Sequence, residues 1–170
     1  GLQKMEYRGY DSVGIATESE NKIVLKKGVG RVVEVNNAVK LDSIPGNIGI
    51  GHTRWATHGK VTEKNAHPHQ SNSGKIAIVH NGIVENFEEL KSDLQNKGYE
   101  FQSETDTEVI ANLIQLNLDE TSDVKQSIIK TVNQIKGHYS FVAIFEDGTL
   151  AAARFHEPLI VGVGKNGHYL

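Results

Sequence analysis

Cysteine is absent from the 170 residues of this chain, and proline, methionine and tryptophan are scarce, with three, one and one copies. The lack of cysteine excludes disulfide bonds, thiolate metal sites and thiol catalysis by these residues. With so little proline, and with 17 glycines scattered singly, no flexible or proline-rich linker divides the sequence. We therefore expect residues 1–170 to fold as one domain.

The chain also lacks an apolar run of about 18 residues, the length that a membrane-spanning helix requires. Its longest apolar stretches, LAAARF and LIVGVG, have the length of strands. The formal net charge is −3, and lysine and arginine are scattered rather than clustered as on nucleic-acid-binding surfaces. The opening segment GLQKMEYRGY contains no apolar signal-peptide core. We therefore expect no membrane segment, no nucleic-acid partner and a cytoplasmic location.

Both ends of the chain have the pattern of an interrupted element. Leu2 and Met5 are spaced like the last turn of a helix whose beginning is not in the sequence, and the strand-like residues 168–170 stop without a turn. Removal of an initiator methionine before Gly1 is the alternative explanation of the start. We expect a domain that is truncated at both ends.

Runs of β-branched and apolar residues between turn signals predict strands near both ends of the chain. Several of these runs flank short polar turns and are expected to pair as antiparallel hairpins. Residues 31–41 suit either a strand or a helix, and we favour a short helix. The predicted strands are residues 13–17, 23–26, 48–52, 75–80, 139–145, 150–155, 159–163 and 168–170.

Helical spacing of apolar residues predicts three helices in the middle of the chain, at 84–97, 107–118 and 124–136. Ser122 or Asp123 is the expected N-cap of the third. Asn81-Gly82 is expected to end the strand before the first helix. Hairpins with helices clustered between them indicate an α+β fold with antiparallel sheets.

Residues 53–74 show neither the two-residue period of a strand nor the 3.6-residue period of a helix. They form a segment longer than ordinary loops, and segments of this length are usually functional or disordered. Trp55, the only tryptophan, argues against disorder. Histidines gather here, and His67 and His69 could face one metal ion from an extended segment. The ordinary alternative is that they bond to the backbone. Because no HExxH pattern or cysteine accompanies them, we predict no metal site.

Three further features are weak signals when each is taken alone. Arg54 is either a solvated charge or a two-donor clamp for a carboxylate or phosphate. Asp106 suits the N-terminus of a helix, where the dipole favours an acidic residue. Asn81-Gly82 after an apolar strand is either a plain turn or a pair of donors with the geometry of an oxyanion hole.

Five segments in unbroken order are far more specific than any single residue. They are EYRGYDSVGIA at 6–16, GHTRWATHG at 51–59, NAHPH at 65–69, HNGIVEN at 80–86 and SETDTEVIA at 103–111. Together they resemble the glutaminase domains of the glucosamine-6-phosphate synthase family. Related amidotransferases of the purine and asparagine pathways share the Asn-Gly element, whereas the RGYDS and HTRWATHG runs are typical of the hexosamine branch.

This resemblance implies a four-layer sandwich of the N-terminal-nucleophile hydrolases, with two antiparallel sheets between helical layers. It implies hydrolysis of glutamine by an N-terminal cysteine whose own α-amine acts as the base, without a cofactor. The ammonia would pass to sugar isomerase domains downstream of this chain, which act on fructose 6-phosphate. The parent protein is expected to be a homodimer or a higher oligomer.

The resemblance also assigns roles to individual residues. The glutamine carboxylate is expected at Arg54, with help from Thr57 and His58, and its ammonium at Asp106. Trp55 is expected to close over the substrate. Asn81 and Gly82 are expected to form the oxyanion hole, and the backbone of Gly82 is also expected to contact the substrate. Arg8 is expected to line the catalytic site. His67 and His80 are expected to support the scaffold, and His80 is placed to position Asn81 and Gly82.

The sequence departs from the family in lacking the nucleophilic cysteine, since the similar region starts after the family's first strand. We therefore expect the chain as given to be inactive. One alternative is a glutaminase domain that serves another acceptor. The other is a glutamine-binding module without catalysis, which is the literal reading of a chain without cysteine.

Overall fold

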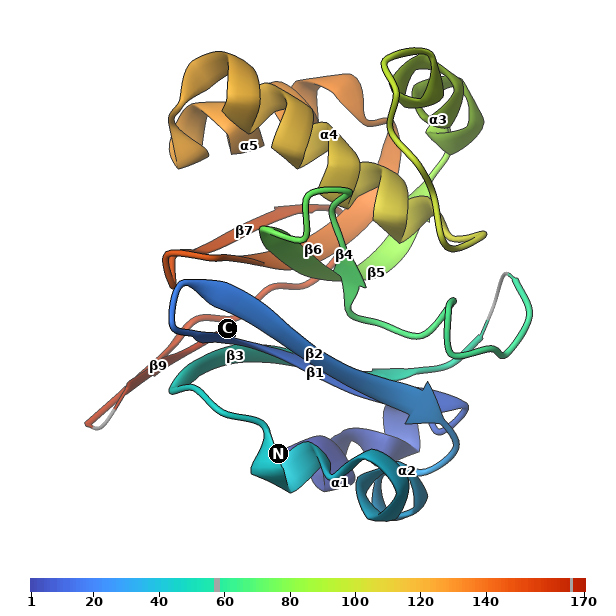
Figure 1. Cartoon of the computed structure of the whole chain (residues 1–170), viewed down its shortest axis with the longest axis vertical. Coiled ribbons are helices and arrows are strands. Elements are labelled where there is room, and N and C mark those ends of the chain that lie inside the picture. Colours follow the sequence, from blue (N-terminus) through green and yellow to red (C-terminus); the bar gives the residue numbers. More distant parts are fainter. Residues whose placement is uncertain (57–58, 166) are drawn as a thin grey trace.

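The computed structural model describes residues 1–56, 59–165 and 167–170. Two sheets, of three and four strands, lie between two groups of helices, and the last two strands of the chain form a separate two-stranded sheet (Figure 1). In chain order the elements are α1 (Leu2–Met5), η1 (Glu6–Arg8), β1 (Ser12–Ser19), β2 (Lys22–Val29), α2 (Val32–Val39), η2 (Leu41–Ser43), β3 (Ile48–Arg54), β4 (His69–Gln70), β5 (Ile76–Val84), α3 (Phe87–Asn96), α4 (Asp106–Thr121), α5 (Val124–Gln134), β6 (Gly137–Phe145), β7 (Leu150–Phe155), β8 (Gly162–Gly164) and β9 (Gly167–Tyr169).

The first sheet has the strand order β2-β1-β3, and all of its pairs are antiparallel. Glu20 and Asn21 both have a φ of 55°, which gives the two-residue hairpin turn whose twist suits the flanking strands. On the other edge, Ser12 at the start of β1 pairs with Arg54 at the end of β3. Helices α1 and α2 lie on the outer face of this sheet (Figure 1).

The second sheet has the strand order β4-β5-β6-β7, and helices α3, α4 and α5 cover its outer face (Figure 1). The largest apolar cluster fills the space between this sheet and these helices, with Ile78, Ile110 and Phe141 at its centre. Helix α4 is the most buried of the three, because it packs on both the sheet and its helical neighbours. A rigid, well-packed frame therefore supports the start of α4 and the end of β5.

The inner faces of the two sheets meet through a small apolar cluster. Ala16 and Ile50 come from the first sheet, and Ala77 and Ile144 from the second. Two of these four residues are alanines, whose small side chains let the sheets approach closely. The sheets therefore place residues of β3 opposite residues of β5, although the strands belong to different sheets.

The expected α+β class with antiparallel hairpins is confirmed, and so is the short helix within residues 31–41, which is α2. Asp123 caps α5, since its Oδ1 accepts a hydrogen bond from the Gln126 amide at 2.8 Å. The strand expected at 159–163 occupies only Gly162–Gly164. Residues 53–74 contain the short strand β4 that the sequence pattern did not predict.

The expected strand end at Asn81-Gly82 is wrong. Strand β5 continues to Val84, with Gly82 paired to Tyr139 of β6, and helix α3 begins only at Phe87. Glycine at φ +123° lets the chain pass through this point in a conformation that other residues rarely adopt. The two residues therefore lie within a paired strand rather than in a free turn.

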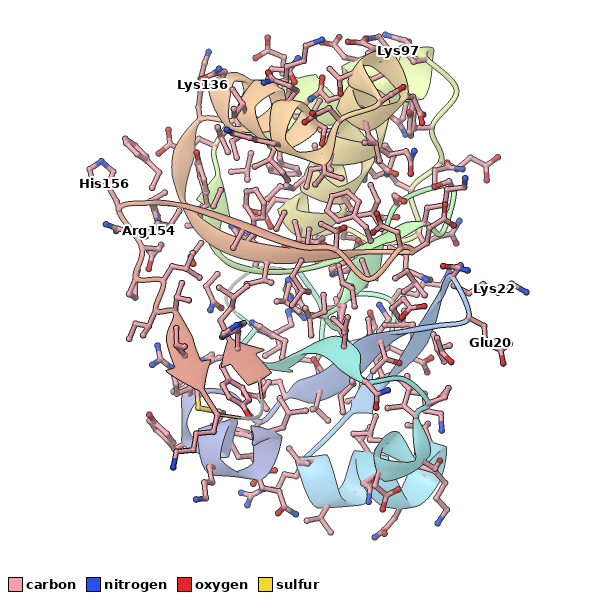
Figure 2. All side chains as sticks on the ribbon, turned by 90° about the vertical axis from the view of Figure 1, so that its left-hand side faces the viewer. Glu20, Lys22, Lys97, Lys136, Arg154 and His156 are labelled. Atoms are coloured by element: carbon pink, nitrogen blue, oxygen red, sulfur yellow. The ribbon has the colours of Figure 1, made fainter. Side chains whose placement is uncertain are left out.

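The charged side chains labelled in Figure 2 lie at the edges of the molecule. Glu20 and Lys22 mark the tip of the β1–β2 hairpin, Lys97 lies at the end of α3, and Arg154 lies on the edge strand β7.

In the described part of the chain, no helix is both long and apolar enough to cross a membrane.

Candidate active site

Arg54, the last residue of β3, is buried with 6% of its surface exposed. Alternation along the strand places it on the same face as Ile50 and His52, toward the second sheet. Its Nη1 donates a hydrogen bond to the carbonyl oxygen of Lys60 at 3.4 Å. Burial lowers the pKa of Arg54, while the carboxylates of Asp11 and Asp106 oppose this change. A guanidinium stays charged under such conditions and offers two parallel donors to a carboxylate.

The chain around Arg54 is held by residues 9–11. The Asp11 amide donates to the Arg54 carbonyl oxygen at 3.0 Å, and Asp11 Oδ2 accepts from the Ala56 amide at 2.8 Å. Gly9 packs so closely that a Cβ there would lie 2.5 Å from the carbonyl carbon of Arg54. Residues 9–11 and 54–56 therefore pack together as one local structure.

Trp55 follows Arg54, and 58% of its surface is exposed. Its ring packs on Tyr10, with 5.8 Å between the ring centroids. Arg8, at the end of η1, is exposed beside this same segment. The expected substrate contacts of Thr57 and His58 lie outside the described residues.

Asn81 and Gly82 lie at the exposed end of β5. The Oδ1 of Asn81 lies 3.0 Å from Nε2 of His52, across the gap between the two sheets. A Cβ on Gly82 would lie 2.1 Å from the carbonyl oxygen of His138, so only glycine fits there without a shift of the backbone. Close strand pairing thus fixes the backbone at Gly82, and a neighbouring imidazole contacts the side chain of Asn81.

Asp106 is the first residue of α4, and 23% of its side chain is exposed. Its Oδ2 accepts a hydrogen bond from the Val84 amide at 2.9 Å, which joins the start of α4 to the end of β5. Its Oδ1 lies 3.4 Å from Thr107 Oγ1 and 3.9 Å from His80 Nδ1. The positive end of the helix dipole favours a negative charge here. The carboxylate is therefore fixed in place and remains partly open to a ligand.

The side chains of His52, His67, His69 and His80 form a buried cluster beside Asn81 and Asp106. The ring of His67 lies 4.4 Å from that of His52 and 4.9 Å from that of His69, between centroids. His67 Nε2 and His80 Nδ1 lie 2.9 and 3.0 Å from the hydroxyl of Thr107. Burial lowers the pKa of each of these four histidines, with that of His80 falling to about 4. Near neutral pH the cluster is therefore uncharged.

The described residues of the histidine cluster do not form a metal site. Among the residues that the structure describes, no group of three or more histidine, cysteine, aspartate or glutamate side chains is arranged to hold a metal ion. His67 and His69, adjacent through Pro68, bond instead to the hydroxyls of Thr107 and Thr105.

The fold brings together residues that are far apart in the sequence. Arg54, Asn81 with Gly82, and Asp106 lie where the ends of β3 and β5 meet the start of α4. The region offers a cation, a carboxylate and an exposed amide. Sequence reasoning missed the supporting roles of Asp11 and His52. The strand period alone would have placed His52 on the same face as Arg54.

Comparison with known proteins assigns this region to a family. A family model described as "Glutamine amidotransferase domain" matches residues 52–169. Glutamine–fructose-6-phosphate aminotransferase (isomerizing) of Pyrococcus horikoshii is 49% identical over 172 aligned residues, which cover 100% of this chain and 29% of that protein. The protein of the same name from Methanothermobacter thermautotrophicus is 47% identical, over 99% of this chain and 29% of its own length. The chain thus spans less than a third of these curated relatives.

Solved structures give the same result for the fold. Glutamine phosphoribosylpyrophosphate amidotransferase of Bacillus subtilis, in complex with ADP and GMP, is 32% identical with a TM-score of 0.72. The likeness covers 85% of this chain and 31% of that one. The α+β architecture described above is thus that of known amidotransferases. By sequence and by fold, the chain belongs to the family of glutamine amidotransferase domains.

Proposed function

We propose that residues 1–170 form the glutamine-binding part of a glutaminase domain that supplies ammonia for the synthesis of glucosamine 6-phosphate from fructose 6-phosphate. The observation that carries the proposal is the convergence of Arg54, Asn81-Gly82 and Asp106 at one end of the two sheets. The identity of 49% to an aminotransferase of this kind, against 32% to a purine-pathway amidotransferase, supports fructose 6-phosphate as the acceptor.

Glutamine fits this region through its two charged ends and its side-chain amide. Its α-carboxylate pairs with the planar fork of Arg54, and its α-ammonium pairs with Asp106. The side-chain carbonyl then points to Asn81 Nδ2 and the backbone of Gly82. Trp55 closes over the bound substrate, Thr57 and His58 support its carboxylate end, and Arg8 lines the side on which the nucleophile approaches.

The reaction requires a thiol that these residues do not contain. In the proposal, an N-terminal cysteine outside residues 1–170 attacks the amide carbon, and its α-amine takes the thiol proton. The oxyanion that forms is held by Asn81 and Gly82. The α-ammonium of the cysteine then gives this proton to the amide nitrogen, and collapse of the tetrahedral intermediate breaks the C–N bond, releases ammonia and leaves a γ-glutamyl thioester. Water then cleaves the thioester to glutamate and regenerates the thiol.

The proposed context of the chain follows from its relatives. Residues 1–170 correspond to a glutaminase domain of the four-layer N-terminal-nucleophile sandwich, followed in the full-length protein by sugar isomerase domains. A homodimer or a higher oligomer is proposed for that protein. The order of helices, sheet, sheet and helices in Figure 1 supports the layered assignment.

The absence of cysteine supports a second candidate, a glutamine-binding module without catalysis. The test is to determine the N-terminal sequence and mass of the native protein and then to measure ammonia release from glutamine. An N-terminal cysteine together with ammonia release supports the glutaminase. A native protein without a thiol that binds glutamine and releases no ammonia would establish the binding module instead. The 170-residue chain itself is expected to release no ammonia.

A further inference from the structure

The hydrogen bond between His52 and Asn81 joins the two sheets beside the candidate site. His52 belongs to β3 of the first sheet, and Asn81 to β5 of the second. The distance between His52 Nε2 and Asn81 Oδ1 is 3.0 Å, which is normal for an N–H donor and an oxygen acceptor. The amide of Asn81 is therefore held from its oxygen side.

The protonation state of His52 follows from its surroundings. An amide oxygen only accepts hydrogen bonds, so Nε2 of His52 carries the proton in this contact. Nδ1 is buried and has no hydrogen-bond partner among the described residues. A proton on Nδ1 would leave a buried donor unsatisfied, and burial lowers the pKa of this imidazole. His52 is thus a neutral ring with its single proton directed at Asn81.

Holding the oxygen of an amide also fixes its nitrogen. The amide group of asparagine is planar, and its Nδ2 points away from Oδ1. With Oδ1 bound to His52, Nδ2 is the end of the amide left to donate to the substrate carbonyl, which the proposed function places at this exposed part of β5. Without His52, rotation about the terminal bond of Asn81 would present oxygen and nitrogen to the substrate alternately, because this torsion is broad and roughly two-fold.

We propose that His52 is a positioning residue that orients the amide of Asn81 so that Nδ2 donates to the oxyanion formed from glutamine. The inference rests on the proposed function, because it assigns a task to a residue that supports the same site.

The histidine next to Asn81 in the sequence does not perform this task. Successive side chains of a strand point to opposite faces, so His80 and Asn81 face different layers. His80 lies toward α4, where its Nδ1 is 3.0 Å from Thr107 Oγ1. Asn81 lies on the face that carries Ala77 and Val79, opposite the first sheet. The expectation that His80 positions the oxyanion pair is replaced by support from His52, which is 29 residues away in sequence.

The test is a double-mutant cycle in the full-length protein with its N-terminal thiol, with glutamine as the substrate. Asn81→Ala is expected to lower kcat by about 10²–10³-fold. His52→Phe keeps a planar ring without the donor and is expected to lower kcat by about 10–100-fold, with little change in KM. In the Asn81→Ala background His52→Phe is expected to cost almost nothing, because the side chain it orients is already gone.

Two further variants separate positioning from simple loss of packing. His52→Gln restores an N–H donor and is expected to recover much of the lost kcat. His69→Phe changes a histidine of the same buried cluster that contacts Thr105 rather than Asn81, so its effect is expected to be equal in both backgrounds.

The outcomes distinguish this inference from the proposed function. If His52→Phe slows the reaction equally with and without the side chain of Asn81, or leaves kcat unchanged while Asn81→Ala lowers it, the positioning role is wrong and the oxyanion role stands. If Asn81→Ala leaves kcat unchanged, the oxyanion role falls, and the role of His52 falls with it.

Discussion

Lowering the pH from 7 to 5 is expected to destabilise the folded chain through its buried histidines. His80 exposes 2% of its side chain. Burial lowers its pKa to about 4, although the nearby carboxylate of Asp106 acts in the opposite direction. The unfolded chain carries the same imidazole in water, where its pKa is about 6.5. Unfolding at pH 5 therefore takes up a proton at His80.

The sign and size of the effect follow from this proton uptake. Between about pH 6.5 and pH 4 the unfolded state holds more protons, so the free energy of unfolding falls as the pH falls. Each pH unit costs about 1.4 kcal/mol for each such histidine. His80 alone therefore removes about 2 kcal/mol by pH 5. Burial lowers the pKa of His52, His67 and His69 as well, and these residues add to the loss in the same direction.

The assay is urea unfolding of the chain at several pH values between 7 and 5. His80→Gln removes one titrating site, so the fall in unfolding free energy with pH is expected to become shallower by about one proton. His168→Gln in the exposed hairpin strand β9 is the matched control for the substitution itself, because this side chain lies outside the buried histidine cluster. If His80→Gln has the same slope as the original chain, the reasoning from buried neutral histidines is refuted.

Two other predictions concern the candidate site. Asn81→Ala in the full-length protein should lower kcat for glutamine more than it raises KM. Asp106→Asn should instead raise KM first, because the glutamine ammonium is already present in the ground state. Steady-state kinetics that showed only KM effects for both variants would exclude the oxyanion role. Gly82→Ala should cost about 1–3 kcal/mol or more, because its Cβ would lie 2.1 Å from the His138 carbonyl oxygen. Thermal unfolding checks this against Gly74→Ala, at a glycine that also has a positive φ, +74° against +123° at Gly82, but open space around its Cβ, and equal losses would contradict the packing argument.

Local sequence signals were sufficient for most of the secondary structure. The β1–β2 hairpin was predictable because alternating apolar residues flank a polar turn, and its two turn residues take the left-handed conformation that suits such a hairpin. The cap of α5 by Asp123 was predictable for a similar reason, since the interaction spans three residues. Such features depend on neighbours in the sequence and therefore appear in the sequence itself.

The Asn81-Gly82 pair shows where local reasoning fails. Asn-Gly is a strong turn signal, but here strand β6 pairs with both residues and continues the ladder to Val84. The pairing partner comes from residues 137–145, more than 50 positions later in the chain. A short-range pattern contains no information about this partner, so the strand end was predicted too early.

The candidate site shows the same contrast between local sequence patterns and contacts of residues that are distant in the sequence. The resemblance assigned roles to Arg54, Asn81, Gly82 and Asp106, which lie inside long motifs. It assigned no role to His52, although this residue lies in the same motif as Arg54, because the contact of His52 with Asn81 appears only when the first sheet is placed against the second. Supporting contacts of this kind depend on which faces of two sheets meet, and no single motif records that.

Arg54→Lys in the full-length protein provides the most direct test of the central claim, that this region binds glutamine by its carboxylate. Lysine keeps the positive charge but loses the planar pair of donors. The account predicts a rise in KM for glutamine of about tenfold or more, the equivalent of roughly 1.4 kcal/mol. Synthesis from free ammonia, which has no carboxylate, should proceed at the original rate. An unchanged KM for glutamine, or an equal loss with ammonia, would contradict the claim.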